Sequence, residues 1–124
     1  MVGRLLRALD ASPARADTAI VLCGDNGFHL GEKLHWRKFT LWEEATHVPL
    51  IYVPPGGGSQ QRVTAPVSLI DIFPTLVVED SQSDDIDGFS LLRTIGGESR
   101  PKPVISSWGR GNHSIRVDGW RYTV

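Results

Sequence analysis

The feature that most constrains the fold is a continuous apolar run, Thr18–Cys23, which ends in the polar tetrapeptide Gly24–Gly27. The run is rich in β-branched residues and shows no polar alternation, which is typical of a strand buried on both faces of a parallel sheet. Pro49–Val53 repeats this pattern and is stopped by Pro54 and Pro55. Together with the helical segments around them, these strands predict an α/β fold.

Two segments carry apolar residues at helical spacing. In Val2–Leu9 the apolar side chains recur at i, i+3, i+4 and i+7, and Ser12 with the proline after it is expected to end this helix. Ser68–Val78 shows the same periodicity and opens with Ser68 and Asp71 as a capping box. A proline inside this second segment requires a kink or a helix start near Asp71.

A further capping box is predicted at Thr40–Glu43, where a hydroxyl and a carboxylate would satisfy backbone N–H groups at a helix start. Lys38 would then lie just outside the helix N-terminus. An ammonium there would add to the helix dipole and the free N–H groups in binding an oxyanion. The alternative reading of Lys38 is a solvated surface charge.

The end of the chain changes character near residue 100. Three short β-type segments, separated by Gly-rich and Asp-Gly turns, follow Pro101–Pro103: Val104–Ser107, Ser114–Val117 and Trp120–Val124. They predict an antiparallel meander, and Asp118-Gly119 is the clearest hairpin turn in the chain. Before them, the acidic stretch Glu79–Asp87 is expected to be a solvated loop.

Composition excludes several classes of protein. The 124 residues, 40% hydrophobic and 22% charged, fall in the globular range. Thirteen basic against fourteen acidic side chains give a net charge of -1, so we expect neither nucleic acid nor an anionic membrane as partner. No apolar run reaches the roughly 20 residues of a transmembrane helix, and the sequence shows no signal-peptide core. The single cysteine, Cys23, is interpreted as a buried strand residue.

Asp25 and Asn26 follow the first predicted strand directly. Ligands collect outside the carboxyl ends of strands in open α/β sheets, so a functional carboxylate is expected there. Carboxylate and amide oxygens suit Ca²⁺ or Mg²⁺ better than zinc, although Ca²⁺ prefers roughly six to eight ligands. Asp-Asn-Gly after a strand is also a common turn, and the residues alone do not decide between the two readings.

The histidines are scattered and are commonly surface or hydrogen-bonded core groups. Two of the four, His29 and His113, are candidates for lining a substrate site, whereas His35 and His47 are not singled out. The four tryptophans, Trp36, Trp42, Trp108 and Trp120, could line a sugar pocket or serve in packing.

Several motifs stand in one order along the chain: Gly24–Lys33, Trp36–Lys38, Ala45–Ile51, Pro66–Leu76, Asp87–Leu92 and Ile115–Tyr122. Together they resemble the C-terminal half of the catalytic domain of a type I sulfatase, in the branch of iduronate-2-sulfatase-like and choline-sulfatase-like members. They occur in the expected order and cover nearly the whole chain. A set of ordered motifs is far more specific than any one of them.

The resemblance implies an alkaline-phosphatase-like mixed sheet flanked by helices over residues 1–100, and the start of a small antiparallel subdomain over residues 101–124. It also implies a divalent cation, Ca²⁺ ahead of Mg²⁺, with Asp25 and Asn26 among its ligands and Lys38 on the sulfate. The nucleophile of the family is a formylglycine in a Cys-x-Pro-x-Arg or related motif. Cys23 lacks the residues that follow in that motif, so the formylglycine is expected in an N-terminal part outside these residues.

The resemblance thus implies a piece of a metal-dependent sulfuric ester hydrolase that acts, when complete, on a sulfated carbohydrate, and that is inactive by itself. Family members are often exported, and the sequence of this chain does not indicate its compartment. One alternative is a phosphodiesterase or phosphonate hydrolase of the same superfamily, and another is a non-catalytic remnant without the nucleophile. Because strand edges would be left unpaired, we expect marginal stability and poor solubility of the isolated chain.

Overall fold

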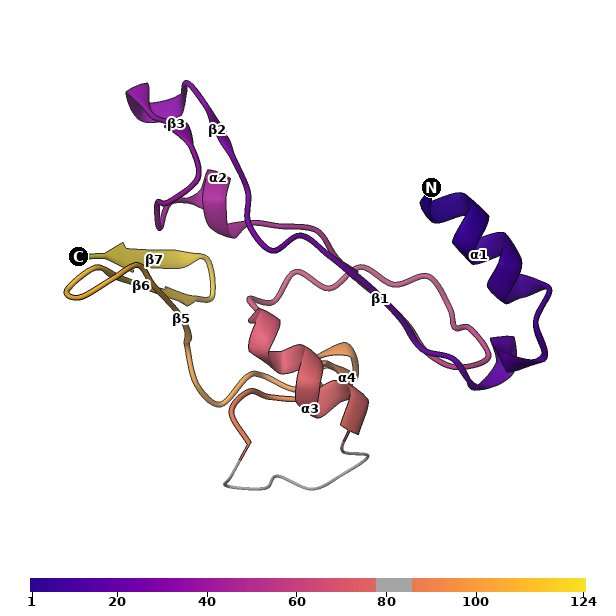
Figure 1. The fold of residues 1–124 in the computed structure, drawn as a ribbon. Helices are drawn as coiled ribbons and strands as arrows, with labels where there is room; N and C mark the ends of the chain where they lie inside the picture. Colours follow the sequence, from indigo (N-terminus) through magenta and orange to yellow (C-terminus); the bar gives the residue numbers. More distant parts are fainter. Residues whose placement is uncertain (78–85) are drawn as a thin grey trace. The chain divides into compact units, whose positions relative to one another are not determined.

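The computed structural model describes residues 1–77 and 86–124. These residues form two compact units, one of residues 1–24 and 49–61 and the other of residues 25–48 and 62–124. Helices and short strands alternate, and the strands belong to small antiparallel sheets, which makes the chain a mixed α/β protein (Figure 1). None of the helices in the described ranges is long and apolar enough to cross a membrane.

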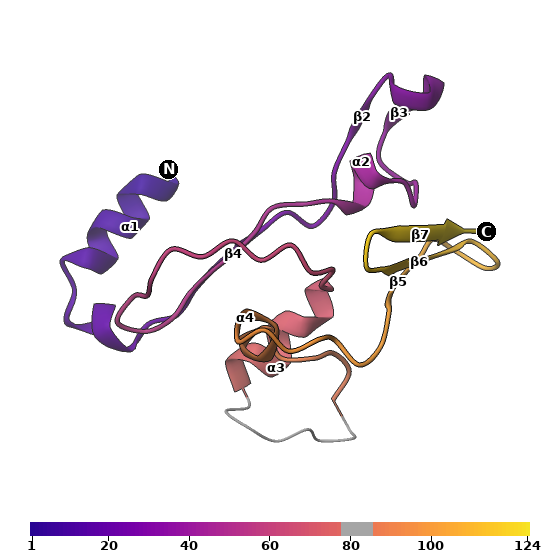
Figure 2. The same ribbon diagram turned by 180° about the vertical axis from the view of Figure 1, so that it is seen from behind.

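The first unit begins with the predicted amphipathic helix, α1 (Val2–Asp10), and a 3₁₀ helix, η1 (Pro13–Asp17). The Ser12 side chain accepts a hydrogen bond from the Ala14 N–H at 3.2 Å, which explains why the helical path is reset at this serine. The chain then forms β1 (Ile20–Cys23), which lies beside β4 (Leu50–Val53) in Figures 1 and 2. The first helix and its end are therefore confirmed.

The expectation that these two strands are buried members of a parallel sheet was wrong. β1 and β4 run antiparallel, with Ile20 opposite Val53 and Cys23 opposite Leu50. Their side chains are half-buried or exposed, and the Cys23 side chain is exposed. A β-branched apolar run specifies extended backbone, but the direction of its partner is set by pairing far along the chain. Within the described residues this sheet has two strands, and its half-buried and exposed side chains show that little packs on its faces.

The second unit opens with a short hairpin. β2 (His29–Leu30) pairs antiparallel with β3 (Trp36–Arg37), and the 3₁₀ helix η2 (Glu32–Leu34) forms the tip between them. Helix α2 (Glu43–Thr46) follows the hairpin and buries Ala45.

The capping box predicted at Thr40–Glu43 was wrong, because Trp42 occupies the N-cap position of α2 and makes no side-chain capping bond. The Thr40 hydroxyl hydrogen-bonds instead to His29, at 2.7 Å. A pattern of four residues cannot anticipate that a histidine eleven positions earlier competes for the hydroxyl.

The capping box of Ser68 and Asp71 is confirmed, and it opens the 3₁₀ helix η3 (Leu69–Asp71). Helix α3 (Ile72–Val77) continues from it, so the helix starts beside Asp71 as its internal proline requires. Helix α4 (Leu91–Ile95) contacts α3. Most of the predicted acidic loop, Glu79–Asp87, lies outside the described residues.

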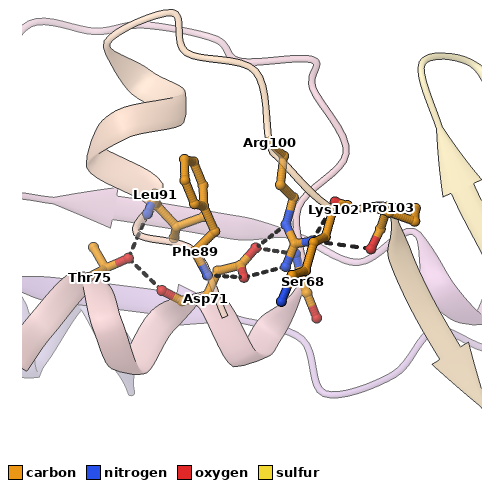
Figure 3. Close-up of polar contacts among 8 residues, drawn as sticks. All are labelled: Ser68, Asp71, Thr75, Phe89, Leu91, Arg100, Lys102 and Pro103. Carbon is orange, nitrogen blue, oxygen red and sulfur yellow. Dashed lines mark hydrogen bonds and ion pairs between the residues drawn. The ribbon is translucent and has the colours of Figure 1, made fainter. Parts of the chain in front are cut away.

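The buried Asp71 carboxylate joins the elements of this region (Figure 3). It accepts hydrogen bonds from the Ser68 and Phe89 backbone N–H groups, each at 2.8 Å, and pairs with Arg100 at 2.8 Å. Arg100 in turn donates to the carbonyl oxygens of Lys102 and Pro103. One carboxylate therefore holds η3, the segment before α4 and the approach to the last strands, and we call this group the Asp71 clasp.

The predicted C-terminal meander is confirmed as an antiparallel sheet of β5 (Val104–Ser107), β6 (His113–Val117) and β7 (Trp120–Thr123). Asp118 and Gly119 both have positive φ, at 38° and 84°, as the hairpin turn requires. Arg116 and Arg121 on one face of the sheet form ion pairs with Glu43 of α2. The opposite face carries apolar side chains and is exposed: Ile105, Ile115, Val117, Trp120 and Tyr122.

Candidate functional site

Asp25 and Asn26, the two candidate metal ligands, are exposed and lie between β1 and β2. The residue after them, Gly27, fixes their position by donating its N–H to the Ala45 carbonyl oxygen of α2 at 2.8 Å. A Cβ at Gly27 would overlap the carbonyl group of Glu44, so glycine is required for this close approach. A backbone contact thus holds Gly27, the residue directly after the Asp-Asn pair, against α2.

The register of the hairpin brings Lys38 to the same end as this pair. His29 lies opposite Arg37, so the next residue, Lys38, leaves β3 where the chain enters β2 from Asn26. The tip with η2 is at the other end of the hairpin (Figure 1). The candidate ligands and the candidate sulfate lysine therefore share the open end of one hairpin. The structure gives no direct contact between their side chains within the described residues.

Lys38 is half-buried, and its Nζ lies 5.7 Å from the centre of the Phe39 ring. The residues on both sides of it have left-handed backbone angles, with φ of 77° at Arg37 and 75° at Phe39. For side chains of this size such angles cost roughly 1–3 kcal/mol each and persist only where surrounding contacts enforce them. The Phe39 ring packs on Trp108, with ring centres 4.7 Å apart. Neither the strain nor this aromatic pair was predicted from the sequence.

His29, the first of the two candidate site-lining histidines, is fully buried. Its Nε2 hydrogen-bonds the Thr40 hydroxyl at 2.7 Å, and its ring meets His35 and Trp42 edge-to-face at 5.0 and 5.6 Å. Nδ1 of His29 has no hydrogen-bond partner among the described residues. The ring therefore faces the inside of the hairpin-to-α2 segment.

The second candidate, His113, lies at the start of β6 and is exposed. Its Nδ1 hydrogen-bonds the Ser107 hydroxyl of β5 at 2.8 Å. This contact lies within the C-terminal sheet, and no contact that the structure gives for His113 reaches the β2–β3 hairpin in the described residues.

Charge is also placed at the tip of the hairpin. The Leu30 N–H donates to the Glu32 carboxylate at 2.7 Å, and this bond, followed by one from the N–H of Glu32 itself, lowers the pKa of Glu32 below its ordinary value. The nearby Lys33 ammonium lies 5.2 Å from the centre of the Trp42 ring. These groups stabilise the tip and belong to the end away from Lys38.

Two of the ligands expected for the predicted metal ion, Asp25 and Asn26, lie in the described residues. No group of three or more His, Cys, Asp or Glu side chains placed to hold a metal ion occurs in residues 1–77 and 86–124. Asp25 and Asn26 supply hard oxygen donors of the kind Ca²⁺ accepts, and both side chains are exposed. A calcium site at this pair stays a prediction, and other residues would have to contribute most of its ligands.

Comparison with known proteins gives a consistent result. The family model described as Sulfatase matches residues 1–78. A "Sulfatase" of Formosa agariphila is 37% identical over 98% of this chain and 25% of its own length. The human "Iduronate 2-sulfatase" is 40% identical over 77% of the chain and 18% of its own length.

A "Choline-sulfatase" of Rhizobium meliloti is 30% identical over 98% of the chain and 26% of its own length. The chain thus spans about a quarter of the length of the curated relatives that it matches over almost all of its residues. The family match includes Asp25, Asn26 and Lys38, the residues that the hairpin brings to one end. The chain belongs to the sulfatase family.

Proposed function

We propose that this chain forms part of the substrate site of a sulfuric ester hydrolase, with an alkaline-phosphatase-like fold in the complete protein. The observation that carries the proposal is the hairpin register, which puts Lys38 and the Asp25-Asn26 pair at one end of a segment inside the family match. A cation and an ammonium at one place are what a sulfate group with several oxygens requires.

In this proposal Asp25 and Asn26 each offer one side-chain oxygen to a calcium ion. When bound, the cation would neutralise charge on the sulfate oxygens. Further ligands and the formylglycine would come from other parts of a longer polypeptide. This chain spans about a quarter of the length of the relatives that it matches, and Cys23 is not in a formylglycine motif.

Lys38 would bind the sulfate through its ammonium. It is half-buried, so part of its stem is shielded while the side chain stays accessible. A positive charge at that place stabilises the anionic substrate, and more strongly the charge that develops when the ester bond breaks. Lys38 is therefore the residue of this chain that we expect to matter most for turnover.

The proposed substrate class is a sulfated carbohydrate, and two of the relatives are named after the esters they act on, iduronate 2-sulfatase and choline-sulfatase. The first name supports a sugar-derived alcohol, and the 40% identity to that protein favours it over choline.

The test is sulfate binding by the chain, monitored by NMR of ¹⁵N-labelled protein in the presence of Ca²⁺. Sulfate should shift the Lys38 and Asn26 signals, and Lys38→Ala should abolish this response. Lys102→Ala, which removes an exposed lysine outside the hairpin, is the control and should leave binding unchanged. Binding that survives Lys38→Ala, or that requires phosphate rather than sulfate, would contradict the proposal.

Hydrolysis is tested on the longer polypeptide, whose reading frame is found by sequencing the genomic DNA on the 5′ side of the Met1 codon. An in-frame formylglycine motif predicts hydrolysis of sulfated sugars that falls at least 100-fold in Lys38→Ala, in the range seen when one charge-stabilising donor is removed. An interrupted frame would assign the chain to a remnant without activity.

A further inference from the structure

We propose that His29 is a positioning residue for Lys38, which acts through the backbone that carries the lysine and does not touch the substrate. The inference rests on the proposed function of Lys38 as the sulfate-binding group. It goes beyond that function by assigning a role to a buried side chain that the anion cannot reach.

The first step is that the Lys38 segment does not hold its own shape. Residues 38–42 link β3 to α2 and contain no helix or strand. Arg37 and Phe39, on either side of Lys38, both have left-handed backbone angles. Each is unfavourable for a residue with a side chain, so contacts from outside the segment must select this conformation.

The second step is that two imidazoles supply such contacts. His29 Nε2 bonds the Thr40 hydroxyl at 2.7 Å, two residues after Lys38, while His35 Nε2 lies 3.4 Å from the Lys38 carbonyl oxygen. The 2.7 Å bond is the stronger of the two, since protein hydrogen bonds to nitrogen commonly span about 2.7–3.2 Å and the 3.4 Å contact lies beyond that range. The His29 ring also packs against the His35 ring, with centres 5.0 Å apart. His29 therefore supports both attachments.

The third step is burial. The His29 side chain has 0% relative exposure, so it lies behind the segment, whereas Lys38 remains partly accessible. A fully enclosed ring with one short hydrogen bond is rigid, and its partner hydroxyl is held with it. Such a residue can change the affinity for an anion only by changing where Lys38 sits.

The experiment uses the difference between the two nitrogens of His29. The side-chain amide nitrogen of glutamine is as many bonds from Cβ as Nε2 of histidine. The amide nitrogen of asparagine is as many bonds from Cβ as Nδ1 of histidine. His29→Gln should therefore keep the bond to Thr40, whereas His29→Asn should lose it, because Nδ1 has no partner. At the other partner of this bond, Thr40→Ser keeps the hydroxyl and Thr40→Val removes it. The control is His47→Gln, which replaces an exposed histidine of the same unit.

The measured quantity is the Kd for inorganic sulfate of the full chain with Ca²⁺, together with the melting temperature. We expect His29→Asn and Thr40→Val to weaken sulfate binding by about 2- to 10-fold, the range for one lost hydrogen bond. His29→Gln, Thr40→Ser and His47→Gln should bind as the original chain does. The double variant His29→Asn, Thr40→Val should be no weaker than either single variant, since both remove the same bond.

The backbone signals of Lys38 and Phe39 give a second readout that does not depend on sulfate. They should move farther in His29→Asn than in His29→Gln, because both variants remove the ring but only asparagine also loses the bond to Thr40. Equal behaviour of the glutamine and asparagine variants in this readout would overturn the inference. If Lys38→Ala left sulfate binding intact, the proposed function would fail, while the backbone signals would still decide whether His29 positions the segment.

A loss of folding is also distinguished from a loss of positioning. A variant with an unchanged melting temperature and weakened sulfate binding supports the inference. If His29→Asn melts early, Thr40→Val gives the decisive comparison, because it keeps the imidazole and its packing. Normal sulfate affinity and normal Lys38 signals in a folded Thr40→Val chain would overturn the proposal.

Discussion

Glu32 shows at the residue scale how a fully exposed carboxylate can still be tied to the fold. The backbone N–H of Leu30 donates to it and lowers its pKa, and the N–H of Glu32 itself acts in the same direction. Because the folded pKa lies below the unfolded one, the ionised form contributes to hairpin stability above the unfolded pKa of roughly 4.3. That contribution is lost as the pH falls through the lower, folded pKa.

The prediction for Glu32 is a carboxyl titration midpoint that lies lower in the folded chain than in the urea-unfolded chain, measured by ¹³C NMR of the side chain. In the urea-unfolded chain the midpoint should return to roughly 4.3. Glu32→Gln should remove the acid sensitivity of the Leu30 amide signal. A folded midpoint at or above the unfolded midpoint would show that the hydrogen bond from Leu30 does not persist in solution.

Element-scale organisation of the second unit depends on the Asp71 clasp, which joins η3, α4 and the approach to β5 through one buried carboxylate. Asp71→Ala should lower the free energy of unfolding by about 3–5 kcal/mol, because Arg100 would keep a largely buried charge without its partner. The measurement is urea unfolding followed by circular dichroism.

The matched control is Glu98→Gln, which breaks the ion pair with Arg93. Both of its side chains are substantially exposed, so the expected change is within about 1 kcal/mol. A similar loss in the two variants would mean that the clasp stabilises the chain no more than a surface ion pair does.

Element prediction from the sequence succeeded where the determining contacts are local. Helix α1, the Ser68-Asp71 capping box and the Asp118-Gly119 hairpin each depend on residues a few positions apart. It failed for the direction of the β1–β4 pair and for the cap at Thr40, where partners distant in the chain decide. Long-range pairing of this kind is not encoded in periodicity.

Prediction of the candidate site divides in the same way. Residues Asp25, Asn26 and Lys38 could be chosen from motifs, but their common position at one hairpin end follows from the register of β2 and β3. Their roles as ligands and sulfate contact stay predictions. The His29–Thr40 bond and the Phe39–Trp108 pair were missed, although a histidine in the hairpin and an aromatic residue beside the lysine were visible in the sequence.

At the scale of the whole molecule, exposed apolar side chains outnumber the four buried hydrophobic residues of the core in the described ranges, and contiguous exposed apolar patches mark association sites. One face of the β5–β6–β7 sheet is apolar and exposed, with Trp120 82% and Tyr122 67% accessible. We therefore expect the isolated chain to self-associate in the micromolar range, seen by sedimentation velocity at several concentrations. Trp120→Lys should shift the distribution toward monomer. A concentration-independent monomer with a cooperative melt would contradict this expectation and the expected marginal stability.

The Asp71 clasp also has a consequence for how much length variation the chain can accept. Asp71 and its partners Phe89 and Arg100 lie on opposite sides of residues 78–85 in the sequence, and they are held to each other without help from the covalent connection. Doubling the number of residues between two held points costs only about 0.6 kcal/mol of closure entropy, well below the about 3–5 kcal/mol expected when one partner of the clasp is removed. Insertions at this place should therefore be tolerated, which makes it a natural position for an affinity tag or a reporter domain.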